Sequence, residues 1–485
     1  MLFQTPNFLV LMVAVLLCMA FVRTHMLQIV LLLAASYIFY MSWNPTFILL
    51  ILFSTVNDYV AGLGIAGSKT RRARVCWLLM SCFTNLGLLA VFKYLGFFVA
   101  SVNQVWLAWY GGSAVLPAVA LTLPVGISFF TFQSMSYTID LFRGEIKPER
   151  SFMRFALYVA FFPQLVAGPI LRSKEFIPQL RSVVELRAEN LLQGCNQFLV
   201  GLVKKVIIAD NIAPLVNQIF AAPQGSPSAA IWLGALAFGI QIYGDFSGYS
   251  DMAIGSARML GFHIPRNFNF PYAARSITDF WRRWHISLST WLRDYLYIPL
   301  GGNRKGRTAT YRNLFVTMAL GGLWHGAGLN FIVWGMYHGA LLAVERSVGF
   351  GRQKEGVRSA RPASFWARGK TLVVWLLIQY LVFLGWVIFR VHNWSDLTYC
   401  VRKYVFFDFN FDPGAMGLSG TNPFVTVGII LVFVLLHAIS YRSNGLIHHL
   451  NRLRGFQLGL VWMVVLLCLM FLWPTGRTAF IYFQF

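Results

Sequence analysis

Long apolar stretches recur along the whole chain and constrain its fold more than any other feature. A helix needs about 20 apolar residues to cross the hydrocarbon core of a bilayer. Charged residues make up 12% of the 485 residues and apolar residues 57%, which leaves too few charges to cover a water-soluble surface. The sequence therefore predicts an all-α polytopic membrane protein with about 11 transmembrane helices. The predicted spans are 7–22, 26–40, 46–67, 76–99, 115–141, 152–170, 191–213, 229–255, 371–391, 422–441 and 457–475.

Basic residues gather in alternate loops between these stretches. The first loop holds Arg23, the third holds four basic residues within 69–74, and the fifth holds three within 143–150, whereas the second and fourth are uncharged. Cytoplasmic loops carry an excess of Lys and Arg, so this alternation predicts an amino terminus outside and loops one, three and five inside. The same bias accounts for the net charge of +23, and we expect no nucleic-acid partner.

The segment 313–345 is predicted to leave the cytoplasmic side and return to it, because the basic segments 301–312 and 346–370 flank it. One straight helix would be about 50 Å long against a core of about 30 Å, and each arm of a hairpin would have about half the length needed. Four glycines within 321–328 mark the expected break. Broken backbone at membrane depth must be buried in protein or line a wet cavity, so we expect His325 near the bottom of an internal cavity.

Two histidines and one polar cluster are the candidate functional groups. His325 and His285 each lie in a dense polar and aromatic setting, where ionisable groups are expensive and therefore candidates for function. The alternatives are a core imidazole bonded to a backbone carbonyl for His325 and an interfacial position for His285. Residues 243–251 place Tyr243, Asp245 and Ser247 inside an apolar span, which suits either a cavity wall or a structural hydrogen-bond network.

Several other chemistries lack support in the sequence. The six cysteines show no zinc spacing, no G-x-S-x-G elbow is present, and we expect no metal site. The letters of residues 62–67 match a dinucleotide fingerprint, but they end a membrane span rather than join a strand to a helix. Small residues that let helices pack closely are the better interpretation.

Five motifs in a fixed order show a resemblance to a known family. The motifs are PVGISFFTFQ at 124–133, FPQLVAGPI at 162–170, QIYGDFSGYSD at 241–251, DFWRRWHIS at 279–287 and LWHGA at 323–327. On these motifs the chain resembles the membrane-bound O-acyltransferase family, and within it the bacterial alginate O-acetyltransferase branch, over roughly residues 1 to 475.

The resemblance implies a single membrane domain in which spanning helices and re-entrant or half helices surround a central funnel. Its expected parts are amino-terminal helices over 1–120, a catalytic core over 121–345, a basic cytoplasmic linker over 346–370 and carboxy-terminal helices over 371–485.

The resemblance also implies an activity. An acetyl group from cytoplasmic acetyl-CoA would cross the bacterial inner membrane for O-acetylation of an exported polysaccharide, alginate or similar. His325 matches the family's invariant histidine and would act as general base, while His285 would orient the acceptor or donate a hydrogen bond to the oxyanion. No permanently bound cofactor is expected, and a periplasmic acetyltransferase partner would complete the transfer. Further candidates are Trp324, Asp245, Tyr243, Ser247 and Arg283 for the funnel, and Arg304 and Lys305 for the donor's phosphates.

Two alternatives remain open at the level of sequence. A transporter or export channel also uses broken helices and intramembrane polar groups, although no internal repeat is visible here. The second alternative is a related acyltransferase that moves D-alanine from a carrier protein to teichoic acid.

Overall fold

A computed structural model describes residues 1–119, 121–349, 365–414, 416, 423–443, 445–474, 476 and 480–481. Within these ranges the regular structure is entirely helical, which confirms the all-α prediction. Most of the predicted linker 346–370 lies outside the described residues.

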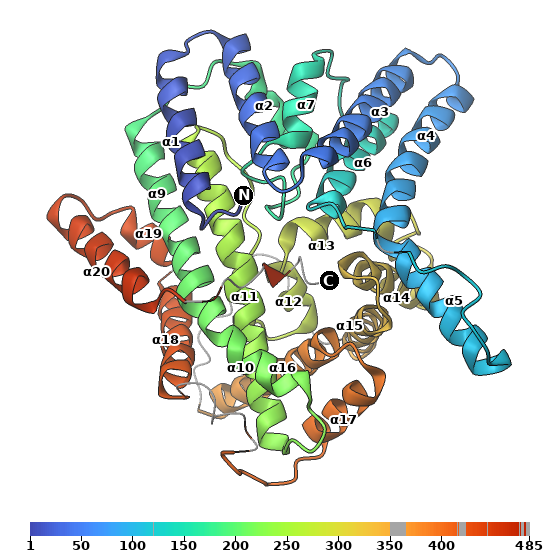
Figure 1. Cartoon of the computed structure of the whole chain (residues 1–485), viewed down its shortest axis with the longest axis vertical. Coiled ribbons are helices and arrows are strands. Elements are labelled where there is room, and N and C mark those ends of the chain that lie inside the picture. The colour runs from blue at the N-terminus through green and yellow to red at the C-terminus, as the bar shows by residue number, and fades with distance from the viewer. Residues whose placement is uncertain are drawn as a thin grey trace. The chain divides into compact units, whose positions relative to one another are not determined.

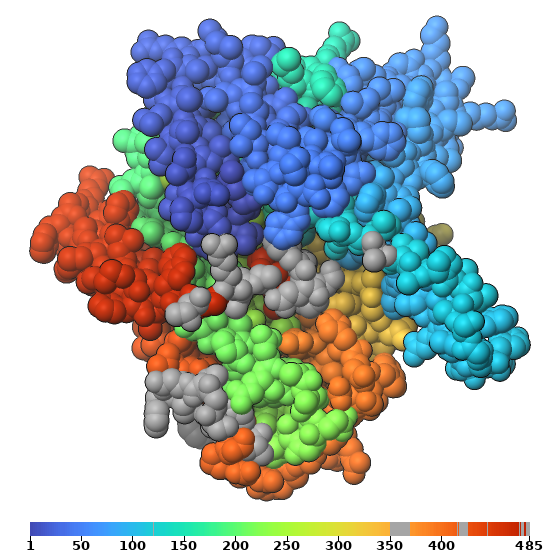
Figure 2. Space-filling view, in the orientation of Figure 1, coloured from blue at the N-terminus to red at the C-terminus, as the bar shows by residue number. Residues whose placement is uncertain are grey.

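Five helical segments are long and apolar enough to cross a membrane: Pro45–Gly67, Arg71–Tyr110, Ser228–Met259, Gly369–Arg390 and Val425–Arg442. Three shorter apolar helices are α1 (Pro6–Phe21), α2 (His25–Met41) and α20 (Phe456–Leu472). Large apolar side chains such as Phe456 and Phe471 lie exposed on α20, which is visible in red in Figure 2. A surface of this kind requires lipid as its solvent, so the chain is a multi-pass membrane protein.

The chain divides into two compact units. The first comprises residues 1–198 and 249–265, and the second comprises 199–248 and 266–485. The first unit contains, besides α1 and α2, η1 (Pro45–Phe47), α3 (Ile48–Gly67), α4 (Arg71–Leu89), η2 (Ala90–Tyr94), α5 (Leu95–Tyr110), α6 (Ile127–Arg143), α7 (Phe152–Ala160), α8 (Ser173–Phe176) and η3 (Ile177–Arg181). Two helices, α9 (Ala188–Leu202) and α11 (Ser228–Met259), contribute residues to both units.

The second unit contains the hairpin that carries His325 and, besides α20, the remaining helices. These are η4 (Val203–Ala209), α10 (Asp210–Ala221), η5 (Pro271–Ala273), α12 (Ile277–Arg283), α13 (Ile286–Leu292), η6 (Arg293–Tyr297), α14 (Gly306–His325), α15 (Leu329–Ser347), α16 (Phe365–Arg390), α17 (Trp394–Val405), α18 (Pro423–Arg442) and α19 (Leu446–Leu450).

Two predicted spans of the first unit are shorter helices than expected. The span 115–141 contains α6, which begins only at Ile127, because Gly126 takes a left-handed conformation (φ 77°) that L side chains rarely adopt. The span 152–170 contains α7, which ends at Ala160 and is followed by a buried non-helical turn. A Cβ on Gly126 would lie 2.7 Å from the carbonyl oxygen of Leu165 in that turn, so the two irregular segments pack backbone to backbone.

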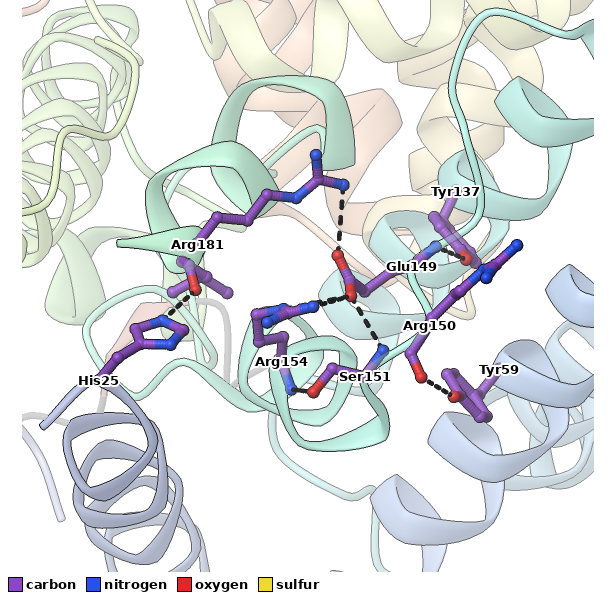
Figure 3. A network of polar contacts seen from close by, with 9 residues as sticks. His25, Tyr59, Tyr137, Glu149, Arg150, Ser151, Arg154 and Arg181 are labelled. Atoms are coloured by element: carbon purple, nitrogen blue, oxygen red, sulfur yellow. Dashed lines mark hydrogen bonds and ion pairs between the residues drawn. The ribbon is translucent and has the colours of Figure 1, made fainter. Parts of the chain in front are cut away.

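A buried carboxylate joins the loop before α7 to η3 in the first unit (Figure 3). Glu149 accepts hydrogen bonds from the Ser151 N–H at 2.9 Å and from Arg154 Nη2 at 2.7 Å, and Arg181 lies 3.4 Å away. The N–H of Glu149 donates to the Tyr137 hydroxyl. Burial alone would raise the pKa of this carboxyl, but the hydrogen bonds from Arg154 and Ser151 and the two guanidinium charges hold it below its usual value.

The expected hairpin is present in the second unit. Helices α14 and α15 lie side by side (Figure 1) and have 20 and 19 residues, about 30 Å each. Each arm is longer than predicted, because α14 begins at Gly306 inside the predicted basic loop and stays helical through Gly321 and Gly322. The helix breaks only over 326–328.

Candidate functional site

Glycines on both arms bring the backbones of α14 and α15 into contact beside His325. A Cβ on Gly322 would lie 2.1 Å from the Phe331 carbonyl oxygen, and one on Gly335 would lie 2.2 Å from the Met318 carbonyl oxygen. No real Cβ fits at such distances, so only glycine allows this approach. The side chains that follow these glycines are therefore held at fixed positions across the hairpin.

His325 is the last residue of α14 and lies at the break. Gly326 and Gly328 take extended backbone conformations, and a Cβ on Gly326 would enter the ring of Phe331. The His325 side chain is 4% exposed. Its ring centroid lies 5.0 Å from that of Trp324 and 5.2 Å from that of Trp334. His325 is thus buried among aromatic side chains.

His285 lies close to His325. It sits between α12 and α13 with a left-handed backbone (φ 42°), which is uncommon for a residue other than glycine and is often found at functional sites. Its fully buried ring has its centroid 6.4 Å from that of His325 and 5.9 Å from that of Trp324. Phe246 of α11 packs edge-on against it at 4.6 Å. The structure therefore brings together three residues selected from the sequence.

Asn267 fixes the protonation pattern of the His285 ring. Its side-chain oxygen accepts from the N–H of Ser287 at 3.2 Å and from the Ser287 hydroxyl at 2.9 Å, and it lies 3.2 Å from His285 Nδ1. A backbone N–H can only donate, so the atom facing it is the amide oxygen. Nδ1 of His285 must then carry the proton that it donates to this oxygen, and the lone pair of the neutral ring lies on Nε2.

Sequence reasoning missed Asn267. It lies in a loop 18 residues before His285 and belongs to none of the five motifs. The only signal in the sequence was a polar residue beside the aromatic residue Phe268. In the structure the Phe268 ring stacks with its centroid 6.4 Å from that of His285.

Asp245 occupies a buried ion cluster of the second unit. Lys205 of η4 lies 2.8 Å from Asp245 Oδ1 and 2.8 Å from Asp210 Oδ1, and Asp245 Oδ2 accepts from the N–H of Ile481 at 2.7 Å. Among the described residues Asp245 has no direct contact with His285 or His325. Its environment favours the structural interpretation, in which a network locks neighbouring segments together.

The remaining candidates lie in different parts of the second unit. The ring of Tyr243 packs 5.8 Å from Phe268, and Ser247 is buried on α11. Arg283 is held by Asp279, with Nε 2.7 Å from Oδ1. Arg304 and Lys305 are exposed just before α14, at the end of the helix opposite His325.

The fold and the site define a class: a helical membrane protein with two buried, adjacent imidazoles at a helix break. A family model described as "MBOAT, membrane-bound O-acyltransferase family" matches residues 16–387. The chain belongs to this family, and it is an acyltransferase.

Curated relatives agree with this assignment. The chain is 46% identical over 395 residues to "Probable alginate O-acetylase AlgI" of Pseudomonas aeruginosa, which covers 81% of this chain and 72% of that protein. It is 34% identical over 453 residues to the peptidoglycan O-acetyltransferase of Helicobacter pylori, a match that covers 87% of this chain and 81% of that protein. It is 30% identical over 227 residues to the teichoic acid D-alanyltransferase of Bacillus subtilis, a match that covers 45% of this chain and 58% of that protein.

Proposed function

We propose that this protein is an O-acetyltransferase of the bacterial inner membrane that takes its acetyl group from cytoplasmic acetyl-CoA. The group would be used for O-acetylation of an exported polysaccharide, alginate or similar. The relatives named for O-acetyl transfer cover 81% and 87% of this chain, whereas two relatives named for D-alanyl transfer cover 45% and 54% of it.

The observation that carries the proposal is the pair of buried rings, His325 and His285, at the break of the α14–α15 hairpin. In the proposed reaction, the oxygen of an acceptor hydroxyl attacks the thioester carbonyl carbon while its proton passes to the imidazole of His325. The carbonyl oxygen becomes an oxyanion. The C–S bond then breaks, and the leaving thiolate takes the proton back, which yields an ester and free CoA thiol.

The surroundings of the two rings suit this chemistry. The aromatic side chains of Trp324, Trp334 and Phe389 contact His325 and exclude bulk water, which strengthens electrostatic interactions and limits hydrolysis of the thioester. Since the lone pair of His285 lies on Nε2, this ring accepts a hydrogen bond. We propose that it orients the acceptor through a hydroxyl or N–H group other than the one that reacts.

Donor and partner follow from the same proposal. Arg304 and Lys305 would hold the phosphates of acetyl-CoA as part of a cytoplasmic basic segment. A periplasmic acetyltransferase would complete the transfer to the polymer.

Radiolabelled acetyl-CoA and the purified protein in lipid nanodiscs test this function. We expect thioester cleavage that depends on the wild-type protein and on an added hydroxyl acceptor. His325→Ala should abolish the cleavage while the protein still reaches the membrane at wild-type level. A wild-type rate in His325→Ala would overturn the role of His325.

The same assay separates the alternatives. A transporter or channel would release no thiol from acetyl-CoA. A protein that is active only with a D-alanyl carrier protein, and inactive with acetyl-CoA, would belong to the teichoic acid branch.

A further inference from the structure

The proposed reaction needs a hydrogen-bond donor for the oxyanion, and His285 does not provide one. Its Nδ1 proton is directed to Asn267, whose oxygen also accepts from Ser287. The other nitrogen of the neutral ring has no proton to donate. The donor must therefore come from another residue beside His325.

Trp334 presents such a donor. Its side chain is 1% exposed, and its ring centroid lies 5.2 Å from that of His325, with the two rings nearly perpendicular at 88°. Among the described residues its indole N–H has no hydrogen-bond partner. An unpaired buried donor is costly in a native protein, and a donor of this kind beside a candidate catalytic group is available to a substrate.

The hairpin holds this donor rigidly. Gly335 follows Trp334 directly and touches the backbone of α14 at Met318, so α15 cannot shift here without a backbone clash. The Trp334 ring also packs against Phe389, with 5.1 Å between the ring centroids. A donor fixed before the reaction needs no reorganisation when charge develops, which is the condition for strong oxyanion stabilisation.

We propose that the indole N–H of Trp334 is the oxyanion donor of the acyl transfer, a role that rests on the proposed function. As the hydroxyl oxygen attacks and His325 takes its proton, the thioester carbonyl oxygen gains the negative charge. It then accepts a hydrogen bond from Trp334 Nε1. When the C–S bond breaks, the carbonyl double bond re-forms and the negative charge leaves on the sulfur. The proton then passes from His325 to this thiolate, and Trp334 is unchanged.

Two variants of Trp334 test the role. Trp334→Phe removes the N–H and part of the ring. Replacement of Trp334 by 3-benzothienylalanine exchanges only the N–H for sulfur and keeps the bicyclic shape. Trp386→Phe is the matched control, because Trp386 is equally buried and packs against Trp334, and no contact joins its ring to His325 among the described residues.

The assay measures kcat and KM for acetyl-CoA in nanodiscs. We expect both Trp334 variants to lower kcat by about 10²- to 10³-fold with KM changed less than about threefold, since the donor acts on charge that exists only in the transition state. Trp386→Phe should stay within about threefold of wild type in both constants.

Three results would overturn the assignment: a benzothienylalanine variant with a wild-type kcat, a loss confined to KM, or an equal loss of kcat in Trp386→Phe. Failure of the wild-type protein to cleave acetyl-CoA would count against the proposed function instead. If Trp334→Phe does not fold, the kcat of the benzothienylalanine variant alone tests the role of the Trp334 N–H.

Discussion

The ring nitrogen Nδ1 of His285 lies 3.2 Å from the side-chain oxygen of Asn267, and this contact determines which nitrogen of the ring carries the lone pair. Asn267 lies in a loop and His285 lies between α12 and α13, 18 positions apart in the sequence. A substitution of Asn267 should therefore alter catalysis through His285, without removing a contact to the substrate.

Asn267→Leu should lower kcat by about 10- to 100-fold, the loss that follows removal of the partners that orient functional histidines at metal sites. Asn267→Asp keeps an oxygen acceptor for Nδ1 and should retain more activity than Asn267→Leu. The control is Asn269→Leu in the same loop. Equal activity of Asn267→Leu and wild type, measured as thioester cleavage, would contradict the orienting role.

Gly335→Ala should destabilise the hairpin, because the added Cβ would lie 2.2 Å from a backbone oxygen that cannot rotate away. Overpacking of this kind typically costs about 1–3 kcal/mol. The matched control is Gly428→Ala on α18, where a Cβ meets nothing within 4 Å. Thermal unfolding in detergent should show a lower Tm for Gly335→Ala alone, and equal melting of the two variants would refute the close contact.

Lys205→Met should destabilise the second unit strongly. Lys205 is 1% exposed, and its removal leaves Asp210 and Asp245 buried without their cation, which typically costs about 3–5 kcal/mol. Lys403→Met is the control: it breaks a pair with Asp408 that lies near the surface, and water can solvate the carboxylate left behind. Chemical denaturation should separate the two variants, and similar midpoints would argue against the buried cluster.

The stability contributed by Glu149 should depend on pH. Its folded pKa lies below the usual value of 4.5, so its contribution is fully present above the unfolded pKa and is lost as the pH falls through the folded pKa. Comparing the Tm of wild type and Glu149→Gln between pH 7 and pH 3 should show the largest difference at neutral pH. The difference should shrink below about pH 4.5. A Tm difference between the two proteins that grows as the pH falls would contradict the lowered pKa of Glu149.

The sequence predicted the hairpin and its central histidine because both depend on local signals. Basic residues on either side of 313–345 required the chain to turn back, and the glycines near His325 marked the break. The break itself covers only 326–328, since glycines 321 and 322 serve close helix packing instead. Local sequence cannot distinguish a glycine that ends a helix from one that permits contact with a neighbour.

Features that depend on distant pairing could not be predicted. Ile481 and Asp245 are 236 positions apart, and nothing near either residue indicates the other. The apolar run 152–170 resembles a span, but much of it is a buried turn, because burial in protein and burial in lipid select the same side chains. The roles of His325 and His285 in the reaction stay predictions until the variants are measured.

The backbone contacts of Gly322 and Gly335 also limit how the enzyme can move during turnover. Two helices packed this closely cannot slide past each other easily, since an axial shift would bring a residue with a Cβ to a position that only glycine fits. The hairpin should therefore behave as one rigid piece. Entry of donor and exit of product would then depend on displacement of the elements around it, which makes the hairpin the fixed frame against which any gating motion takes place.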